Sequence, residues 1–147
     1  MSKETALIKA TKAGDLETVK NLFQKKWFPG PADPDGTDQW GCTALHYASE
    51  QDSAELMQVL LDAGADVNAV NRFQHRPIHN AARLGKVVPL RMLIESGAEL
   101  EATEDHGYTP LHWAQRERRQ EAVALLIEQG ANTEALCKEG KRPEELA

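Results

Sequence analysis

A six-residue pattern returns along this chain at a fixed interval of 33 residues. It reads TALHYA, RPIHNA and TPLHWA in three copies, which begin at Thr43, Arg76 and Thr109. A second pattern keeps the same interval and reads GADVNA, GAELEA and GANTEA, beginning at Gly64, Gly97 and Gly130. Two patterns in one register indicate copies of one small structural unit, and such units gain stability by stacking on their neighbours.

Each unit is predicted to be a pair of helices. Thr43 and Thr109 fit the N-cap of a first helix, and Pro77 and Pro110 fit its first position, where no backbone donor is needed. A second apolar run follows over residues 55–61 and again over 122–127. Core candidates lie at helical offsets in these runs: Leu56, Val59 and Leu60, then Val123, Leu126 and Ile127. The glycines that follow suit a left-handed C-terminal cap.

The two patterns resemble those of the ankyrin repeat family, whose unit is a turn followed by two antiparallel helices and is marked by TPLHxA. A further copy, TALIKA, begins at Thr5, and the chain ends in RPEELA, so the resemblance covers nearly all of it. It implies an all-α ankyrin-repeat solenoid of stacked helix-turn-helix units with short β-turn tips, in one domain over residues 1–147. We expect units at about 1–40, 41–73, 74–106 and 107–139, and a partial C-terminal unit at 140–147.

Two units depart from the pattern. In the first unit, five extra residues fall within residues 27–40, which are rich in proline and glycine, so a surface loop is expected there. This unit also has Ile8 in place of the repeat histidine, as a terminal capping unit can have. In the third unit, Arg76 replaces a capping threonine and Gln74 replaces a turn glycine. The third unit is therefore expected to be the weakest.

The recurring histidines, His46, His79 and His112, are interpreted as structural. In the ankyrin family this histidine hydrogen-bonds to backbone and to the neighbouring threonine, which ties repeats together. A catalytic or metal role would have to explain three equivalent copies. No nucleophile, base and orienting group share a signature, and there is no glycine-rich phosphate loop. We therefore expect no enzymatic activity and no cofactor.

Three aspartates near residue 35 raise the question of a calcium loop. An EF-hand loop that begins at Asp33 needs glycine at its sixth position and glutamate at its twelfth, but Asp38 and Ala44 stand there. A polar turn that caps a helix is the preferred interpretation, and no metal is expected.

Composition narrows the compartment and the partners. The net charge of −6 argues against nucleic acid, whose phosphates attract clustered Lys and Arg. Cys42 and Cys137 lie far apart without metal-ligand spacing, so free thiols in a reducing compartment are expected. No signal peptide or membrane-length apolar run is found. We expect a cytoplasmic or nuclear protein that is a monomer by itself and does not bind membranes.

The resemblance implies that partners bind to the turn tips and to the exposed side of the first helices, which line a concave groove. In this register the tip residues are Gln39, Trp40 and Cys42, then Arg72, Phe73 and His75, then Asp105, His106 and Tyr108. Each tip has one aromatic, although the chain is only 5% aromatic, and aromatics are enriched in binding hot spots. The alternative is that these aromatics pack against neighbouring tips. Tyr47 and Trp113, inside the first helices, can serve both structure and binding.

Arginines add a second candidate feature to the same side. Arg83 and Arg116 occupy equivalent positions one helical turn after the histidine and, with Arg72, Arg76 and Arg118, could form a basic patch. Scattered solvated charge is the alternative. A real patch would favour a partner that presents carboxylates or phosphorylated residues beside apolar anchors, because arginine pairs with such groups bidentately.

The main functional hypothesis is a non-catalytic module that binds a protein or peptide, with acidic and apolar features, through its concave groove and tips. A second hypothesis makes the chain a substrate: LLDAGADVN, ending at Asn68, matches ankyrin asparagines that a 2-oxoglutarate-dependent hydroxylase modifies. The ordinary alternative is that this asparagine stabilises the turn. A third hypothesis is that these repeats are one region of a larger enzyme or regulator.

Overall fold

The computed structural model describes residues 1–24 and 30–147. Its helices, in chain order, are α1 (Lys3–Lys12), α2 (Leu16–Leu22), α3 (Ala44–Ala48), α4 (Ala54–Asp62), α5 (Pro77–Leu84), α6 (Val87–Glu95), α7 (Pro110–Arg116) and α8 (Gln120–Glu128), followed by the 3-10 turn η1 (Pro143–Leu146). Residues 27–29, the beginning of the expected inserted loop, lie outside the described residues.

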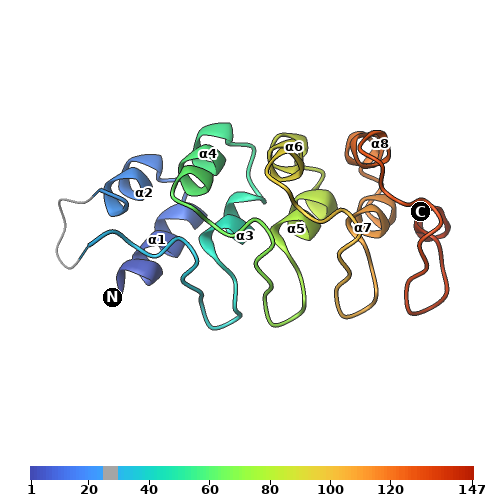
Figure 1. Ribbon diagram of the computed structural model, residues 1–147, viewed down its shortest axis with the longest axis horizontal. Coiled ribbons are helices and arrows are strands. Elements are labelled where there is room, and N and C mark those ends of the chain that lie inside the picture. The colour runs from blue at the N-terminus through green and yellow to red at the C-terminus, as the bar shows by residue number, and fades with distance from the viewer. Residues whose placement is uncertain (25–29) are drawn as a thin grey trace.

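The helices form two rows that run the length of the molecule (Figure 1). One row contains α1, α3, α5, α7 and η1, and the other contains α2, α4, α6 and α8, with contacts between successive members of each row. A hairpin-like turn extends from the first row before each of α3, α5, α7 and η1. This is the expected all-α solenoid of helix-turn-helix units.

The helix ends follow the residues that predicted them. Thr109 Oγ1 accepts a hydrogen bond from the backbone N–H of His112, and Pro77 and Pro110 stand at the first turn of α5 and α7. Pro89 lies in the first turn of α6, where its missing N–H leaves the helix intact. The local signals in the repeated patterns thus set where α5 and α7 begin.

The repeat histidines connect units, as the resemblance implied. His79 Nδ1 accepts from the backbone N–H of Arg76 at 3.0 Å, and its Nε2 lies 2.8 Å from the carbonyl of Ala102. Because Nδ1 accepts, the proton lies on Nε2, which donates to the chain segment that leads into the next turn tip. His46 and His112 make the same pair of contacts, to the carbonyls of His75 and Lys141. Burial lowers the pKa of His79 to about 4.

Leucines and alanines fill the space between the two rows. Leu45, Ile78 and Leu111 in the first row, and Leu56, Leu60, Leu90, Leu93 and Leu126 in the second, are buried. The expectation for α8 was wrong at one position, because Ile127 is 44% exposed and Leu125 is buried in its place. Ile94 occupies the equivalent position on α6. It packs against the core, and α8 is the next helix in the row and contacts α6. Among the described residues, the second row has no further helix packed against α8 at Ile127.

A side-chain bridge recurs at the first three junctions between units. The side chain of Asp35 accepts from the backbone N–H of Asp66 at 2.7 Å, and Glu101 accepts from that of Asn132 at 2.8 Å. Asn68 stands between them in the repeat and accepts from the N–H of Glu99 at 3.0 Å. This bridging role accounts for the asparagine, and hydroxylation of Asn68 stays a prediction that mass spectrometry of native protein checks.

Gln74 stands at a backbone position that suits glycine. Its φ is 62°, and the equivalent residues in the other tips, Gly41, Gly107 and Gly140, have φ of 75°, 74° and 72°. This left-handed conformation costs a residue with a Cβ about 1–2 kcal/mol. The loss of stability expected for the third unit therefore has a structural basis in the backbone conformation of Gln74.

We predict that Gln74→Gly raises the free energy of unfolding by about 0.5–1 kcal/mol, because relief of the left-handed strain exceeds the extra chain entropy of glycine. Urea denaturation followed by circular dichroism measures the change. Gln39→Gly, in the first tip but outside the left-handed region, is the control and should lower stability. A lower denaturation midpoint for Gln74→Gly would contradict the prediction.

Candidate partner-binding surface

Three turn tips line one side of the molecule, and one side chain in each holds its shape. The first tip is residues 38–42, the second 71–75 and the third 104–108. Asp38 accepts from the backbone N–H groups of residues 40 and 42, Asn71 from those of 73 and 75, and Glu104 from those of 106 and 108, all at 2.8–3.0 Å. These hydrogen bonds hold the backbone of each tip in a fixed shape.

An exposed aromatic pair joins the first tip to the second. Trp40 is 49% exposed and Phe73 is 50% exposed, and their rings stack with centroids 6.3 Å apart. The backbone N–H of Arg72 donates to the carbonyl of Trp40 at 3.0 Å, which fixes the two tips beside each other. The rings pack on each other, as the packing alternative expected, and still present half of their surface to solvent, so a binding role for the pair stays a prediction.

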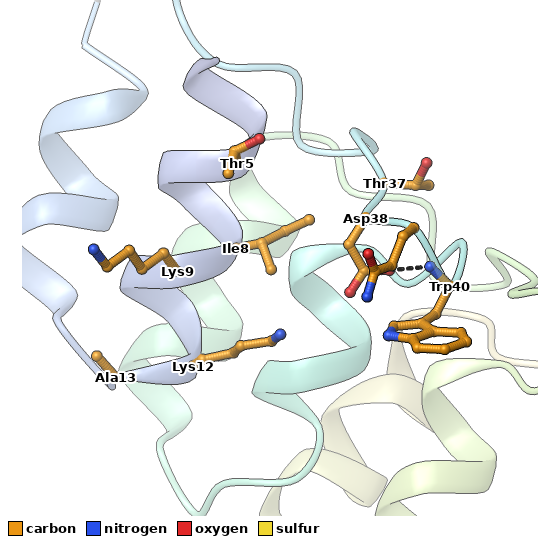
Figure 2. A pocket seen from close by; sticks show the side chains of 9 residues that line it. Thr5, Ile8, Lys9, Lys12, Ala13, Thr37, Asp38 and Trp40 are labelled. Carbon is orange, nitrogen blue, oxygen red and sulfur yellow. Dashed lines mark hydrogen bonds between the residues drawn. The ribbon is translucent and has the colours of Figure 1, made fainter. Parts of the chain in front are cut away.

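A hollow of about 730 Å³ opens beside Trp40, between α1 and the first tip. From α1, Ile8 and Lys12 extend toward the tip, and Asp38 and Trp40 lie across from them (Figure 2). These residues of α1 were not among the predicted partner-binding residues. Unlike α3, α5 and α7, α1 has no turn tip before it among the described residues, so its exposed side faces the hollow and the first tip.

The third tip differs from the prediction, because Tyr108 is buried, with 4% exposure. Its ring stacks on His112 at 5.6 Å and meets Trp113 edge-on at 5.4 Å. Cys42, also expected to face a partner, is buried against the amide of Asn71. Both residues come last in their tips, immediately before an N-cap threonine, so their side chains turn toward the helices.

Two histidines flank a buried carboxylate at the third tip. Glu104 has no exposed side-chain surface, and its Oε2 lies 2.9 Å from His106 Nδ1 and 3.4 Å from His75 Nε2. Burial alone would raise the pKa of Glu104, but hydrogen bonds from His106 and from backbone N–H groups hold it below the usual value. Burial lowers the pKa of His75. Both histidines therefore help to build the tip, while His106 and its neighbour Asp105 keep exposed surface.

Asp38 and Tyr47 join the first tip to α3. The Tyr47 hydroxyl donates to Asp38 at 2.5 Å, and Lys12 Nζ lies 4.2 Å from the centre of the tyrosine ring. Burial and the hydrogen bond to Asp38 raise the pKa of Tyr47. Gln39 is exposed beside Trp40 and lines the same hollow. Tyr47 therefore contacts two residues that line the hollow, Asp38 and Lys12, and is itself only partly exposed.

The predicted arginines are only partly brought together. Arg83 Nη2 lies 3.7 Å from Glu50, and Arg76 Nη1 lies 3.1 Å from Glu99. The Arg116 guanidinium lies over the Trp113 ring at 5.4 Å and over the Tyr108 ring at 5.7 Å. Arg118 is separate, beside Ala147 at the C-terminal end. The basic feature is thus confined to Arg83 and Arg116 on the concave side, with Arg72 near the aromatic pair.

In residues 1–24 and 30–147, no three His, Cys, Asp or Glu side chains converge as a metal site would require. In the same residues, no helix has the length and apolar character needed to cross a membrane.

Comparison with known proteins gives consistent results. Residues 2–71 and 68–136 match the family model described as ankyrin repeats (3 copies). The chain is similar to the palmitoyltransferase akr1 of Schizosaccharomyces pombe, at 40% identity over 65 residues that make up 44% of this chain and 10% of that protein. It is also similar to human ankyrin repeat domain-containing protein 39, at 41% identity over 69 residues, 47% of this chain and 35% of that protein. The matches thus span about a tenth and a third of these relatives.

Proposed function

The chain belongs to the ankyrin repeat family, whose repeats generally serve in protein–protein interaction, and we propose that it is a non-catalytic module that binds a protein or peptide partner. The partner lies along the tips and the concave side of the first row of helices. The observation that carries this proposal is the stacked pair of Trp40 and Phe73, half exposed on two rigid tips beside an open hollow.

The exposure of this pair argues for a binding role. A side chain that serves only to join two tips gains most by complete burial, but each of these rings leaves half of its surface in water. The rings are fixed by their stacking and by the hydrogen bond between the tips, so a partner need not order them. Large, rigid aromatic surfaces of this kind dominate the energy of many interfaces.

We predict that Trp40→Ala with Phe73→Ala lowers the affinity for the partner at least about 100-fold, because two hot-spot aromatics contribute about 2 kcal/mol or more each. The partner is first identified by affinity purification of the native protein and mass spectrometry, and its affinity is then measured by calorimetry.

The matched control is Val88→Ala with Ile127→Ala, which removes two exposed apolar side chains from the second row of helices. The control pair should leave the affinity unchanged, and both variants should keep the helicity of the parent. Equal affinity of the aromatic variant and the parent would reject this surface.

The alternative, that these repeats are the repeat region of a larger enzyme or regulator, is supported by the short match to a palmitoyltransferase. In that case the surface binds a partner or another domain of the same protein. The mass of the native protein in its cell, compared with the 16.3 kDa of this chain, distinguishes the two.

A further inference from the structure

On the concave side, a carboxylate lies beside two donor side chains at the junction between α3 and α5. The equivalent positions between α5 and α7 contain the donors without the carboxylate. Between α3 and α5, Glu50 Oε1 accepts from Asn80 Nδ2 at 3.1 Å and lies 3.7 Å from Arg83 Nη2. One carboxylate of the earlier unit thus accepts a hydrogen bond from Asn80 and forms an ion pair with Arg83 of the later unit. Burial raises the pKa of Glu50, and the nearby charges of Arg83 and Lys12 oppose this rise.

At the junction between α5 and α7, the equivalent positions hold Arg83, Trp113 and Arg116, each 33 residues further along. Trp113 and Arg116 are donors, as Asn80 and Arg83 are at the preceding junction. Arg83, a third donor, occupies the position equivalent to the carboxylate of Glu50. The indole Nε1 of Trp113 is buried and has no hydrogen-bond acceptor. Among the described residues, no carboxylate lies within ion-pairing distance of Arg116.

We propose that the concave side between α5 and α7 binds a carboxylate from an Asp or Glu side chain of the partner, held by Arg116 and Arg83. This proposal rests on the proposed function and specifies the chemistry of the partner at one place. The partner's carboxylate takes at this junction the part that Glu50 takes at the preceding one. The cluster formed by Glu50, Asn80 and Arg83 is the template for it inside the same molecule.

The surroundings hold Arg116 ready for such a group. Its guanidinium lies over the Tyr108 and Trp113 rings, so its side chain is positioned before the partner arrives. The buried carboxylate of Glu104 is already hydrogen-bonded by His106 and by backbone N–H groups. Arg83 has only the long contact to Glu50, at 3.7 Å, so it retains donors for a second carboxylate.

The test uses a blocked glutamate, N-acetyl-glutamic acid N-methylamide, as probe at constant ionic strength maintained with sodium chloride. The indole N–H of Trp113, which lies under Arg116, reports binding in ¹⁵N–¹H NMR spectra. We expect a saturable shift of this signal, and Arg116→Gln should weaken binding of the probe at least about fivefold, because hydrogen bonds to charged groups are the strong ones. Arg91→Gln, on α6 in the second row, is the matched control and should leave binding unchanged.

The same variants are then measured with the partner identified as above. Arg116→Gln should lower its affinity about tenfold, and Arg116→Lys, which keeps the charge but lacks the planar fork, should lower it by less. No saturable shift with the blocked glutamate, or equal binding by Arg116→Gln, would overturn the proposal. A shift with inorganic phosphate alone would overturn it too, in favour of a phosphorylated partner. Loss of partner binding in the Trp40 and Phe73 variant, without any effect of Arg116→Gln, would overturn this inference and leave the proposed function intact.

Discussion

Leu93→Ala is expected to lower the free energy of unfolding by about 3 kcal/mol, because it removes a fully buried side chain and leaves a cavity in a stack that cannot close around it. Leu93 lies on α6, in the middle of the second row, and is completely buried. Helix α6 packs against α4 on one side and α8 on the other. Urea denaturation of the variant and the parent gives the difference.

The loss should extend beyond the substituted unit. In a linear stack each unit is stabilised by its neighbours, so amide hydrogen exchange should become faster in α4 and α8 as well as in α6. Val88→Ala on the same helix is the control, because Val88 is 42% exposed, and a change below about 0.5 kcal/mol is expected for it. Faster exchange in α6 alone would contradict coupling between units.

The second large effect is an expected loss of folding stability as the pH falls below about 6.5. An unfolded histidine takes up a proton near pH 6.5, whereas burial lowers the pKa of folded His79 to about 4. Between these values the unfolded chain binds more protons, so the stabilisation is complete above pH 6.5 and is lost as the pH falls toward 4. From His79 alone the loss by pH 5 is about 2 kcal/mol. Burial also lowers the pKa of His46, which adds to the loss.

The physical reason is the contact that protonation breaks. Neutral His79 accepts at Nδ1 from the backbone N–H of Arg76, and a proton on Nδ1 removes that acceptor. Urea denaturation at pH 7.5 and pH 5 measures the loss, and it should become smaller in His79→Gln, whose amide accepts and donates without titrating. An unchanged difference between the two pH values in His79→Gln would assign the acid sensitivity to other groups.

The repeated patterns predicted the fold because they report local geometry. Threonine before the helix, proline at its first position and glycine after the second helix each fix a backbone conformation, and these signals placed α5, α7 and α8 within a few residues. The same reasoning failed at Ile127 on α8. Burial at that position depends on whether another helix packs against that face of α8, and the local pattern does not report this.

The candidate partner-binding surface was less predictable for a related reason. Position in the repeat identified Trp40 and Phe73, which are exposed, but it also selected Tyr108, which is buried among His112 and Trp113. The third tip contains Glu104 where the first has Asp38 and the second has Asn71, and a longer carboxylate flanked by two histidines gives that tip its own packing. Such contacts depend on side chains that vary from one unit to the next, so the repeated pattern does not predict them.

The bridges made by Asp35, Asn68 and Glu101 have a mechanical consequence. Each spans one boundary only, from a side chain of one unit to a backbone N–H of the next. Tension applied between the two chain ends therefore loads these boundaries in series, and no bridge shares the force on another. Such an assembly yields by peeling, one boundary after another, and lengthens in steps of a single unit under a modest pull.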